Sequence, residues 1–212
     1  APVVCLDGPA LDALRELDAS PDTPAERDAL LAGWRGFADA CVARTGRDAL
    51  ATVSTLDTAR DLDVLRERLG EPTLSYLGVS FGTAIGVAYA HLFPDKVGRL
   101  VLDSPVSLAA RPEPAQVVGF ERQLGEFAAW CAGQGCALGA TRDAVVASVA
   151  ALLTGLDAAP LPAGARRLTQ SLAAEGVLAG LYARASWPGL ASALASARSG
   201  DGRALLAAAD VL

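Results

Sequence analysis

The stretch Leu74-Ser-Tyr-Leu-Gly-Val-Ser-Phe-Gly82 is the part of the sequence that decides the fold. It begins with a short apolar run that includes a tyrosine, a pattern that indicates a buried strand over residues 73–77. It ends in a G-x-S-x-G motif at residues 78–82, and a periodic run of small and apolar residues follows over 83–92. The motif alone is weak evidence for a catalytic serine, because a chain with 21 glycines often contains such a match by chance. A strand before it and a helix after it, however, are the context that a nucleophilic serine on a strained turn requires.

A second strand is predicted directly after this helix. The segment Val97-Gly-Arg-Leu-Val-Leu-Asp103 is apolar and partly β-branched. Strand, sharp turn, helix and strand in about thirty residues make a βαβ unit, which implies a parallel sheet. Strands of such a sheet are buried on both faces, so two strands alone should expose apolar surface.

Helical patterns flank this unit on both sides. Before it we expect helices over residues 22–45, ended by Gly46, and 54–69, capped by Ser54 and Asp57. The first residues, Val3-Val-Cys-Leu6, suggest a short strand or loop followed by a turn at Asp7-Gly-Pro9. After a proline-rich segment only helical patterns appear, over 115–132, 141–154, 164–185, 188–198 and 202–211. This predicts two domains, a sheet-bearing part over 1–104 and a helical part over 105–212.

The motif assigns chemistry to two residues. Ser80 would stand above the sheet edge and attack a carbonyl carbon, and the backbone N–H of Phe81, at the helix N-terminus, would stabilise the oxyanion that forms. A structural glycine-serine turn is the alternative interpretation.

A general base for Ser80 is harder to find. His91 is the only histidine, and it follows Ser80 by eleven residues on the same predicted helix, about 15 Å away. It is therefore interpreted as a histidine at a helix end. Asp103 ends the second strand at the same sheet edge as Ser80, where it is either a triad acid or, more in keeping with its position, a turn-forming residue.

Composition excludes several classes of function. The net charge of −6 disfavours nucleic acid and anionic membranes as partners, and the one basic doublet, Arg166-Arg167, is assigned to a solvated helix face. No apolar run is long enough to span a membrane. A single histidine excludes a multi-histidine metal site, and no cofactor is expected. The absence of methionine, even at position 1, indicates a chain that has been processed, trimmed or excised.

Four cysteines allow three disulfide connectivities. Cys131 and Cys136 enclose a short loop with two glycines and could pair, in which case Cys5 would pair with Cys41. Two disulfides would indicate a protein outside the cytoplasm. The alternative is four free, buried cysteines.

The sequence from Leu74 to Asp103, with Gly-Val-Ser-Phe-Gly-Thr-Ala at its centre, resembles the tripeptidyl-aminopeptidase-like branch of the α/β-hydrolases. These are secreted or envelope-associated bacterial serine peptidases related to proline iminopeptidases. The similarity includes the helix over 55–70, Cys41, and Trp130-Cys131 with Cys136, and it extends more loosely through Trp187-Pro188.

The resemblance implies an α/β-hydrolase core followed by a helical lid. Ser80 would form the acyl-enzyme, and the substrate would be a peptide cleaved at an amide bond near its N-terminus. The resemblance also favours the disulfide pairs Cys5–Cys41 and Cys131–Cys136 and a secreted or envelope location. Acidic lid residues would bind the substrate's α-amino group, the candidates being Glu113, Glu121, Glu126 and Glu175.

The chain also departs from this family. Its members carry an upstream glycine-rich oxyanion loop and a C-terminal segment with the catalytic Asp and His, whereas residues 104–212 contain no histidine. We therefore expect the middle of a longer hydrolase, inactive without its N- and C-terminal parts. Two further hypotheses remain: an esterase or other acyl hydrolase of the same fold, and a non-catalytic remnant that binds peptides.

Overall fold

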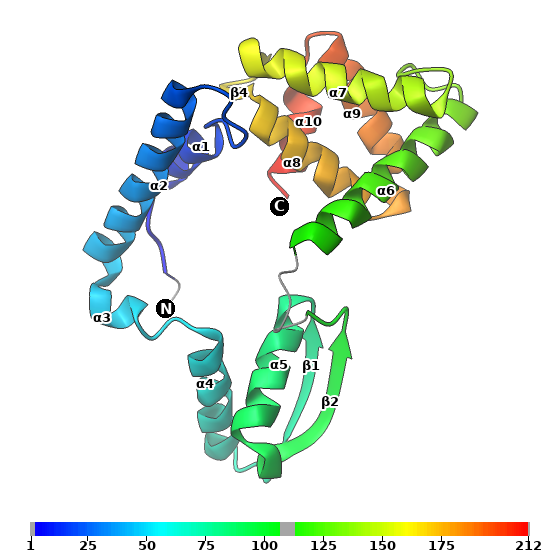
Figure 1. Ribbon diagram of the computed structural model, residues 1–212. Coiled ribbons are helices and arrows are strands. Elements are labelled where there is room, and N and C mark those ends of the chain that lie inside the picture. Colours follow the sequence, from blue (N-terminus) through cyan, green and yellow to red (C-terminus); the bar gives the residue numbers. More distant parts are fainter. Residues whose placement is uncertain (1–2, 107–112, 212) are drawn as a thin grey trace. The chain divides into compact units, whose positions relative to one another are not determined.

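The computed structural model describes residues 3–106 and 113–211, with side chains from residue 116 onward in the second range. Contacts divide the chain into two compact units (Figure 1). The sheet unit is built from residues 41–115 together with 1–3, and the helical unit from residues 4–40 and 116–212. This division does not test the predicted domain boundary at residue 104, which stays a prediction. Residues 4–40 nevertheless group with the helical part of the chain.

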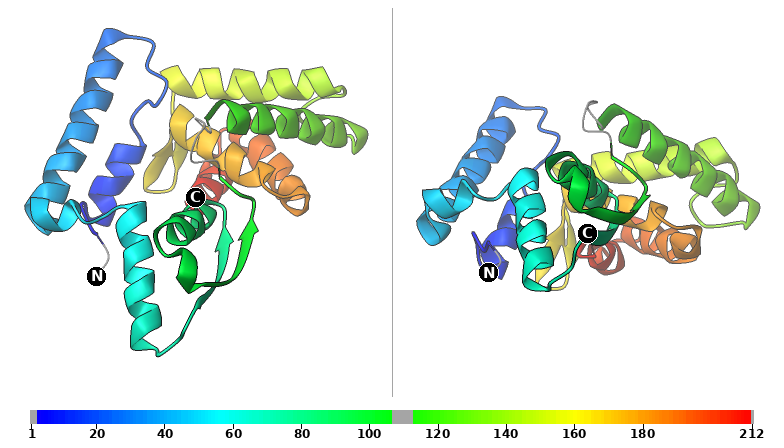
Figure 2. Two further views of the ribbon diagram at one scale, coloured as in Figure 1. Left: turned by 60° about the horizontal axis from the view of Figure 1, so that its bottom comes forward. Right: turned by 90° about the horizontal axis from the view of Figure 1, so that it is seen from below.

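The sheet unit contains the predicted βαβ arrangement. Strand β1 (Leu74–Val79), helix α5 (Phe81–Leu92) and strand β2 (Val97–Asp103) follow one another, with a 3-10 turn at Pro94–Lys96. The strands pair in parallel, with Val79 opposite Asp103. Helix α5 lies along this pair, and α4 (Thr55–Arg68) packs against α5 (Figures 1 and 2).

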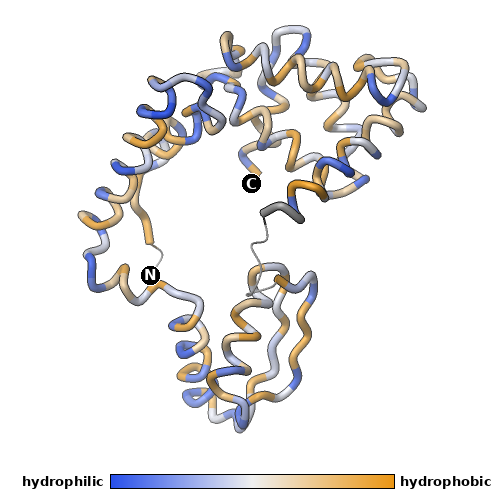
Figure 3. The backbone as a smooth tube through the Cα atoms, viewed as in Figure 1, coloured by the Kyte–Doolittle hydropathy of each residue, from blue (hydrophilic) through white to orange (hydrophobic). Residues whose placement is uncertain are grey.

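Among the described residues of the sheet unit, helix α5 covers one face of the two strands. Tyr76 and Leu102 point towards α5, where both lie within 3.1 Å of the place that a Cβ on Gly86 would occupy. Side chains alternate along a strand, so the next residues point to the opposite face. There Leu77, Val79 and Val101 are 65%, 57% and 58% exposed. Figure 3 shows the apolar stretch along β2.

A small buried cluster and one polar network hold α5 to α4. Ala59, Ala88 and Tyr89 form the cluster. The hydroxyl of Tyr89 donates to Asp63 at 3.0 Å, and Arg66 donates to the same carboxylate oxygen at 2.7 Å. The hydrogen bond from Arg66 lowers the pKa of Asp63, and burial raises the pKa of the Tyr89 hydroxyl.

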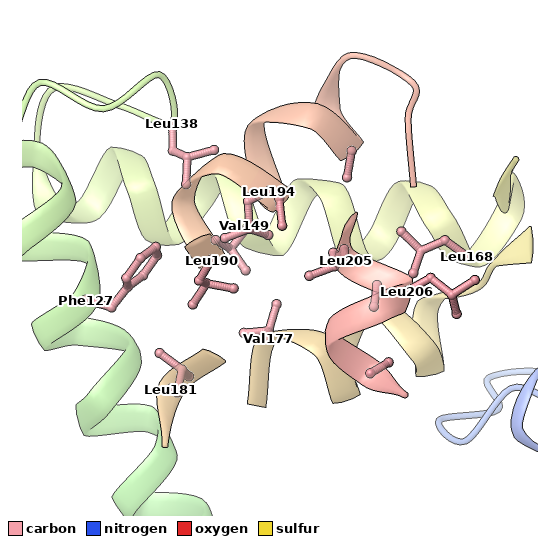
Figure 4. Packing of buried hydrophobic residues seen from close by; sticks show 14 of the residues in the cluster. Phe127, Leu138, Val149, Leu168, Val177, Leu181, Leu190, Leu194, Leu205 and Leu206 are labelled. Carbon is pink, nitrogen blue, oxygen red and sulfur yellow. The ribbon is translucent and has the colours of Figure 1, made fainter. Parts of the chain in front are cut away.

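The helical unit has a large apolar core. Its main helices are α6 (Glu113–Gly133), α7 (Arg142–Ala158), α8 (Gln170–Leu181), α9 (Trp187–Arg198) and α10 (Arg203–Ala209). The core is rich in leucine, valine and aromatic residues, among them Phe127, Leu138, Val149, Leu168, Val177, Leu181, Leu190, Leu194, Leu205 and Leu206 (Figure 4). Close packing of this kind predicts that the unit is rigid.

Within the helical unit, ion pairs hold helix α1 (Gly8–Arg15) to residues that are distant in the sequence. Arg15 contacts Glu175 at 2.5 Å and Asp210 at 3.3 Å. Arg166 contacts Asp12 at 3.2 Å and Asp210 at 2.9 Å. Asp210 therefore forms ion pairs with both arginines. Through Arg15, α1 is held to a residue near the end of the given sequence.

Residues 3–6 form the loop that was predicted as the alternative to a strand, whereas the prediction of a turn after them was wrong. No strand forms over residues 3–6, and the expected turn at Asp7-Gly-Pro9 is the start of α1. The Asp7 carboxylate accepts from the backbone N–H of Ala10 at 3.0 Å, and Pro9 stands where a helix needs no N–H donor. Asp-Gly-Pro suits both a turn and a helix N-terminus, so the residues alone did not separate the two.

The predicted helix over 164–185 was wrong in its first part. A short antiparallel hairpin, β3 (Leu161–Ala163) and β4 (Arg166–Leu168), precedes α8. Gly164 has φ 75° and turns the chain between the strands. The Arg166-Arg167 doublet therefore lies on a strand rather than a helix, and the ion-paired Arg166 side chain is only 22% exposed.

The remaining predicted helices begin and end close to the residues that the sequence indicated. Helix α2 (Pro24–Thr45) ends before Gly46, which has φ 83°. Helix α4 begins after Ser54, whose hydroxyl oxygen accepts from the Asp57 N–H at 3.0 Å. A one-turn helix, α3 (Arg47–Leu50), was not predicted. Within the described residues, no helix is both long enough and apolar enough to cross a bilayer.

Candidate active site

Ser80 occupies the turn between β1 and α5. Its φ of 52° and ψ of −121° are unusual for a residue with a side chain, and the residue is exposed. The backbone N–H of Ser80 donates to the carbonyl oxygen of Asp103 at 3.0 Å, which extends the β1–β2 pairing by one residue. This is the strained strand-to-helix turn that the G-x-S-x-G motif predicts.

Gly78 makes the sharp turn possible. A Cβ at this position would lie 2.6 Å from the carbonyl oxygen of Gly82, so that no side chain fits between β1 and the first turn of α5. At Gly82 itself the nearest atom to a Cβ would be the Tyr76 hydroxyl oxygen at 3.4 Å. The Tyr76 hydroxyl donates to the Gly82 carbonyl at 2.8 Å and joins strand to helix across the turn. The motif therefore needs its first glycine more than its second.

Phe81 is the first residue of α5, and the residue is 61% exposed. A backbone N–H in this position lies at the positive end of the helix dipole and is not used in the helix. The assignment of this N–H to an oxyanion hole stays a prediction.

His91 and Asp103 occupy different places relative to Ser80. His91 lies in the last turn of α5, the helix that starts directly after Ser80, so the rise of the helix separates them by about 15 Å. Asp103 ends β2 beside the end of β1. Its carboxylate accepts from the Ser104 hydroxyl at 3.2 Å. The sheet edge thus brings Asp103 close to Ser80 in the fold, whereas α5 carries His91 away.

Sequence reasoning missed Ser104 and Thr83. Ser104 has φ 55° and is a second strained residue at the same sheet edge. A serine after an aspartate does not by itself indicate a positive φ. Thr83 is fully buried, and its hydroxyl donates to the carbonyl oxygen of Ser80 at 2.6 Å. A threonine just after the motif could have been noticed as a buried polar group in an apolar helix.

The four acidic candidates for amine recognition have different surroundings. Glu175 is paired with Arg15 at 2.5 Å. Glu126 is exposed on α6. The side chain of Glu113 lies outside the described residues.

Glu121 lies beside an apolar cleft of about 460 Å³ in the helical unit. Among the residues that line the cleft, Glu121 is the only acidic one. The rings of Phe120 and Tyr182, also in the lining, meet edge to face at 5.2 Å. The lining comes from α6, α7 and α8 and consists of Gln116, Val117, Phe120, Glu121, Leu124, Val149, Leu153, Ala174, Val177, Leu178, Leu181 and Tyr182. An acidic residue in the lining of an apolar cleft suits a ligand that carries both a cation and an apolar group.

The cysteines of the described residues are oxidised. Cys131 and Cys136 form a disulfide with their Cα atoms 5.3 Å apart. Cys5 and Cys41 are also disulfide-bonded, and no described cysteine is free. In the described part of the chain, no group of three or more His, Cys, Asp or Glu side chains is arranged to hold a metal ion.

Comparison with known proteins agrees with this geometry. The family profile described as "alpha/beta hydrolase fold" matches residues 19–193. The chain is 36% identical to the "Serine protease Hip1" of Mycobacterium tuberculosis over 82% of this chain and 36% of that protein. It is 38% identical to the "Tripeptidyl aminopeptidase" of Streptomyces lividans over 68% of this chain and 28% of that protein. The "Carboxylesterase B" of Mycobacterium tuberculosis is 32% identical over 97% of this chain and 41% of that protein.

The chain spans about a third of the length of the first two of these relatives. The profile match covers most of the chain, including the strained turn at Ser80, both strands and much of the helical unit. The chain therefore belongs to the α/β-hydrolase family.

Proposed function

We propose that the chain is part of a serine hydrolase that cleaves peptides near their N-terminus through an acyl-enzyme on Ser80. The observation that carries this proposal is the strained, exposed turn that presents Ser80 at the N-terminus of α5. The similarity to a serine protease and a tripeptidyl aminopeptidase supports a peptide as the substrate.

In this mechanism the Ser80 hydroxyl oxygen attacks the carbonyl carbon of the scissile bond. The N–H of Phe81 donates to the oxyanion that forms, and the proton from Ser80 passes to a general base and then to the leaving amine. His91 cannot be that base, because α5 carries it about 15 Å away from Ser80. The base, the acid that orients it and a second oxyanion donor are proposed to come from other parts of a longer hydrolase.

The exposed face of the strand pair supports this view of a longer protein. Leu77, Val79 and Val101 lie on the face opposite α5, all more than half exposed. Parallel strands are normally covered on both faces. We infer that further elements of the same hydrolase cover this face and complete the sheet.

The helical unit is proposed to act as the lid that selects substrates. Glu121 is the best of the four acidic candidates for binding the α-amino group, because it is the acidic residue among those that line the apolar cleft. Glu175 already forms an ion pair with Arg15. A peptide with a free amine and an apolar side chain matches this cleft.

The oxidised cysteines support a location outside the cytoplasm. Disulfides persist in secreted and envelope proteins and are rare where thiols are kept reduced. We propose a secreted or envelope-associated enzyme.

A fluorophosphonate probe tests the nucleophile. The longer protein that contains these residues should be labelled at Ser80, and its Ser80→Ala variant should not be labelled. Absence of labelling in the native protein would remove the basis for an enzyme and would leave peptide binding without catalysis as the function.

Esterase activity is a second candidate, favoured by the similarity to a carboxylesterase over nearly the whole chain. The turn at Ser80 serves amide and ester hydrolysis equally. Rates with aminoacyl amides, tripeptidyl amides and simple acyl esters of the same leaving group would decide between them. Faster cleavage of tripeptidyl amides than of aminoacyl amides would support the tripeptidyl class.

A further inference from the structure

Two strained residues end the two neighbouring strands. Ser80 follows β1 with φ 52°, and Ser104 follows β2 with φ 55°. They are the only residues other than glycine with positive φ in the part of the chain that the structure describes. Backbone strain of this kind persists only where the surroundings hold it in place, and it is concentrated at functional sites.

The hydroxyl of Thr83 connects these two turns. Its Oγ1 donates to the carbonyl oxygen of Ser80 at 2.6 Å and accepts from the backbone N–H of Val106 at 2.9 Å. The hydroxyl thus acts as donor to one turn and acceptor from the other. Because Thr83 is fully buried, water has no access to replace either bond.

Three hydrogen bonds hold the Ser80 backbone. Its N–H is fixed by Asp103, and its carbonyl oxygen receives the N–H of Thr83 at 2.9 Å as well as the Thr83 hydroxyl. A valine in place of Thr83 would keep the shape and the backbone bond. It would leave the Ser80 carbonyl with one donor fewer and the Val106 N–H without its acceptor.

We propose that Thr83 is a positioning residue for the nucleophile. Its hydroxyl fixes the orientation of Ser80 by tying the strained turn after β1 to the chain that follows β2. This proposal rests on the proposed function, since it assigns Thr83 a role in the reactivity of Ser80. Thr83 itself touches neither the substrate nor the reacting atoms.

The test compares the kinetics of fluorophosphonate labelling in the longer protein. The variants are Thr83→Val, which removes the hydroxyl at constant shape, and Thr83→Ser, which restores it. The control is Thr58→Val, because the Thr58 hydroxyl also donates to a helical carbonyl, that of Ser54 at 2.9 Å, but on the surface of α4. Each variant yields a maximal rate constant, a half-saturating probe concentration and a final labelled fraction.

We expect Thr83→Val to lower the maximal rate constant about tenfold or more, the order of effect that a small displacement of a reacting group produces. The half-saturating concentration and the labelled fraction should change little. Thr83→Ser should recover the rate to within about threefold, and Thr58→Val should leave it unchanged. If Thr83→Val does not fold, Thr83→Ala takes its place.

Three results overturn the proposal while leaving the proposed function intact. In the first, the variant without the hydroxyl is labelled at the native rate. In the second, it is labelled at the native rate but to a smaller final fraction, which would mean that Thr83 only stabilises the fold. In the third, Thr83→Ser is as slow as Thr83→Val, so the hydroxyl is not the cause. If the native protein is not labelled at Ser80 at all, the proposed function fails, and the role of Thr83 fails with it.

Discussion

At the scale of single residues, the molecule concentrates backbone strain at one sheet edge. A non-glycine residue in a sparsely populated region of φ and ψ costs on the order of 1–3 kcal/mol. Ser80 and Ser104 both lie in such a region, and hydrogen bonds from Thr83 and to Asp103 hold Ser80 there. The strain keeps the Ser80 side chain clear of both the strand and the helix.

Gly78→Ala should disturb this turn. The new methyl carbon would lie 2.6 Å from the carbonyl oxygen of Gly82, so β1 and α5 would have to separate. We expect a loss of stability of about 1–3 kcal/mol, typical of overpacking, together with loss of probe labelling at Ser80. The thermal midpoint and the labelling rate measure the two effects.

Gly155→Ala is the control for this substitution. A Cβ at Gly155 meets no atom within 4 Å, and the residue lies within α7. Alanine there should stabilise the helix by up to about 1 kcal/mol. Equal behaviour of the two variants would argue against the close approach at Gly78.

Glu121→Gln should weaken recognition of a free N-terminus. Loss of the carboxylate charge at the apolar cleft should raise KM about tenfold for peptides with a free amine, with little change in kcat. The KM for N-acetylated peptides should be the same in the variant and in the native protein. Glu126→Gln, on the same helix and exposed, is the matched control. The assignment is wrong if both variants shift KM alike.

The residue scale also shows where sequence reasoning succeeds. The G-x-S-x-G motif encodes its own geometry, because only glycine permits the approach at position 78 and the strand and helix beside it are visible as patterns. Ser104 and Thr83 could not be assigned in this way. Their roles depend on the pairing of β1 with β2, which is a contact between segments more than twenty residues apart.

At the scale of elements, helix boundaries with a cap or a glycine were predictable. Ser54 begins α4 and Gly46 follows α2, because each signal is local. The hairpin at β3 and β4 was not predicted, since three-residue strands offer too few residues to show alternation. Arg166 on β4 forms ion pairs with Asp12 in α1 and with Asp210 directly after α10, both far away in the sequence.

Tyr89→Phe should loosen the packing of α5 on α4. The variant loses the hydrogen bond to Asp63, and we expect about 1–2 kcal/mol less stability at neutral pH. Because Arg66 lowers the pKa of Asp63, the ionised carboxylate contributes fully above the ordinary pKa of about 3.9. The difference in stability between the native protein and the variant should therefore shrink as the pH falls below that value. Urea unfolding at several pH values measures it.

Tyr182→Phe provides the comparison for Tyr89→Phe. Tyr182 is exposed, and its ring contact with Phe120 does not need the hydroxyl. This variant should unfold like the native protein at every pH. A similar loss in both variants would contradict a specific role for the bond between Tyr89 and Asp63.

At the scale of the whole molecule, the proposed mechanism predicts that these 212 residues alone do not turn over peptides. Ser80 is present, but the only histidine lies at the far end of α5. Purified chain should show no Ser80-dependent release from peptidyl or acyl ester substrates above the uncatalysed rate. Robust hydrolysis that disappears in Ser80→Ala would contradict the need for a base from elsewhere.

The ion pairs of α1 have a consequence for the order of folding during synthesis. Arg15 leaves the ribosome 195 residues before its partner Asp210. At 5–20 residues per second this is a delay of about 10 to 40 s, far longer than a helix or hairpin needs to form. Residues 41–115 are made within that interval, so α4, α5 and the β1–β2 pair have time to form before Asp210 is made. The contact between α1 and Asp210 in the helical unit can form only after that interval.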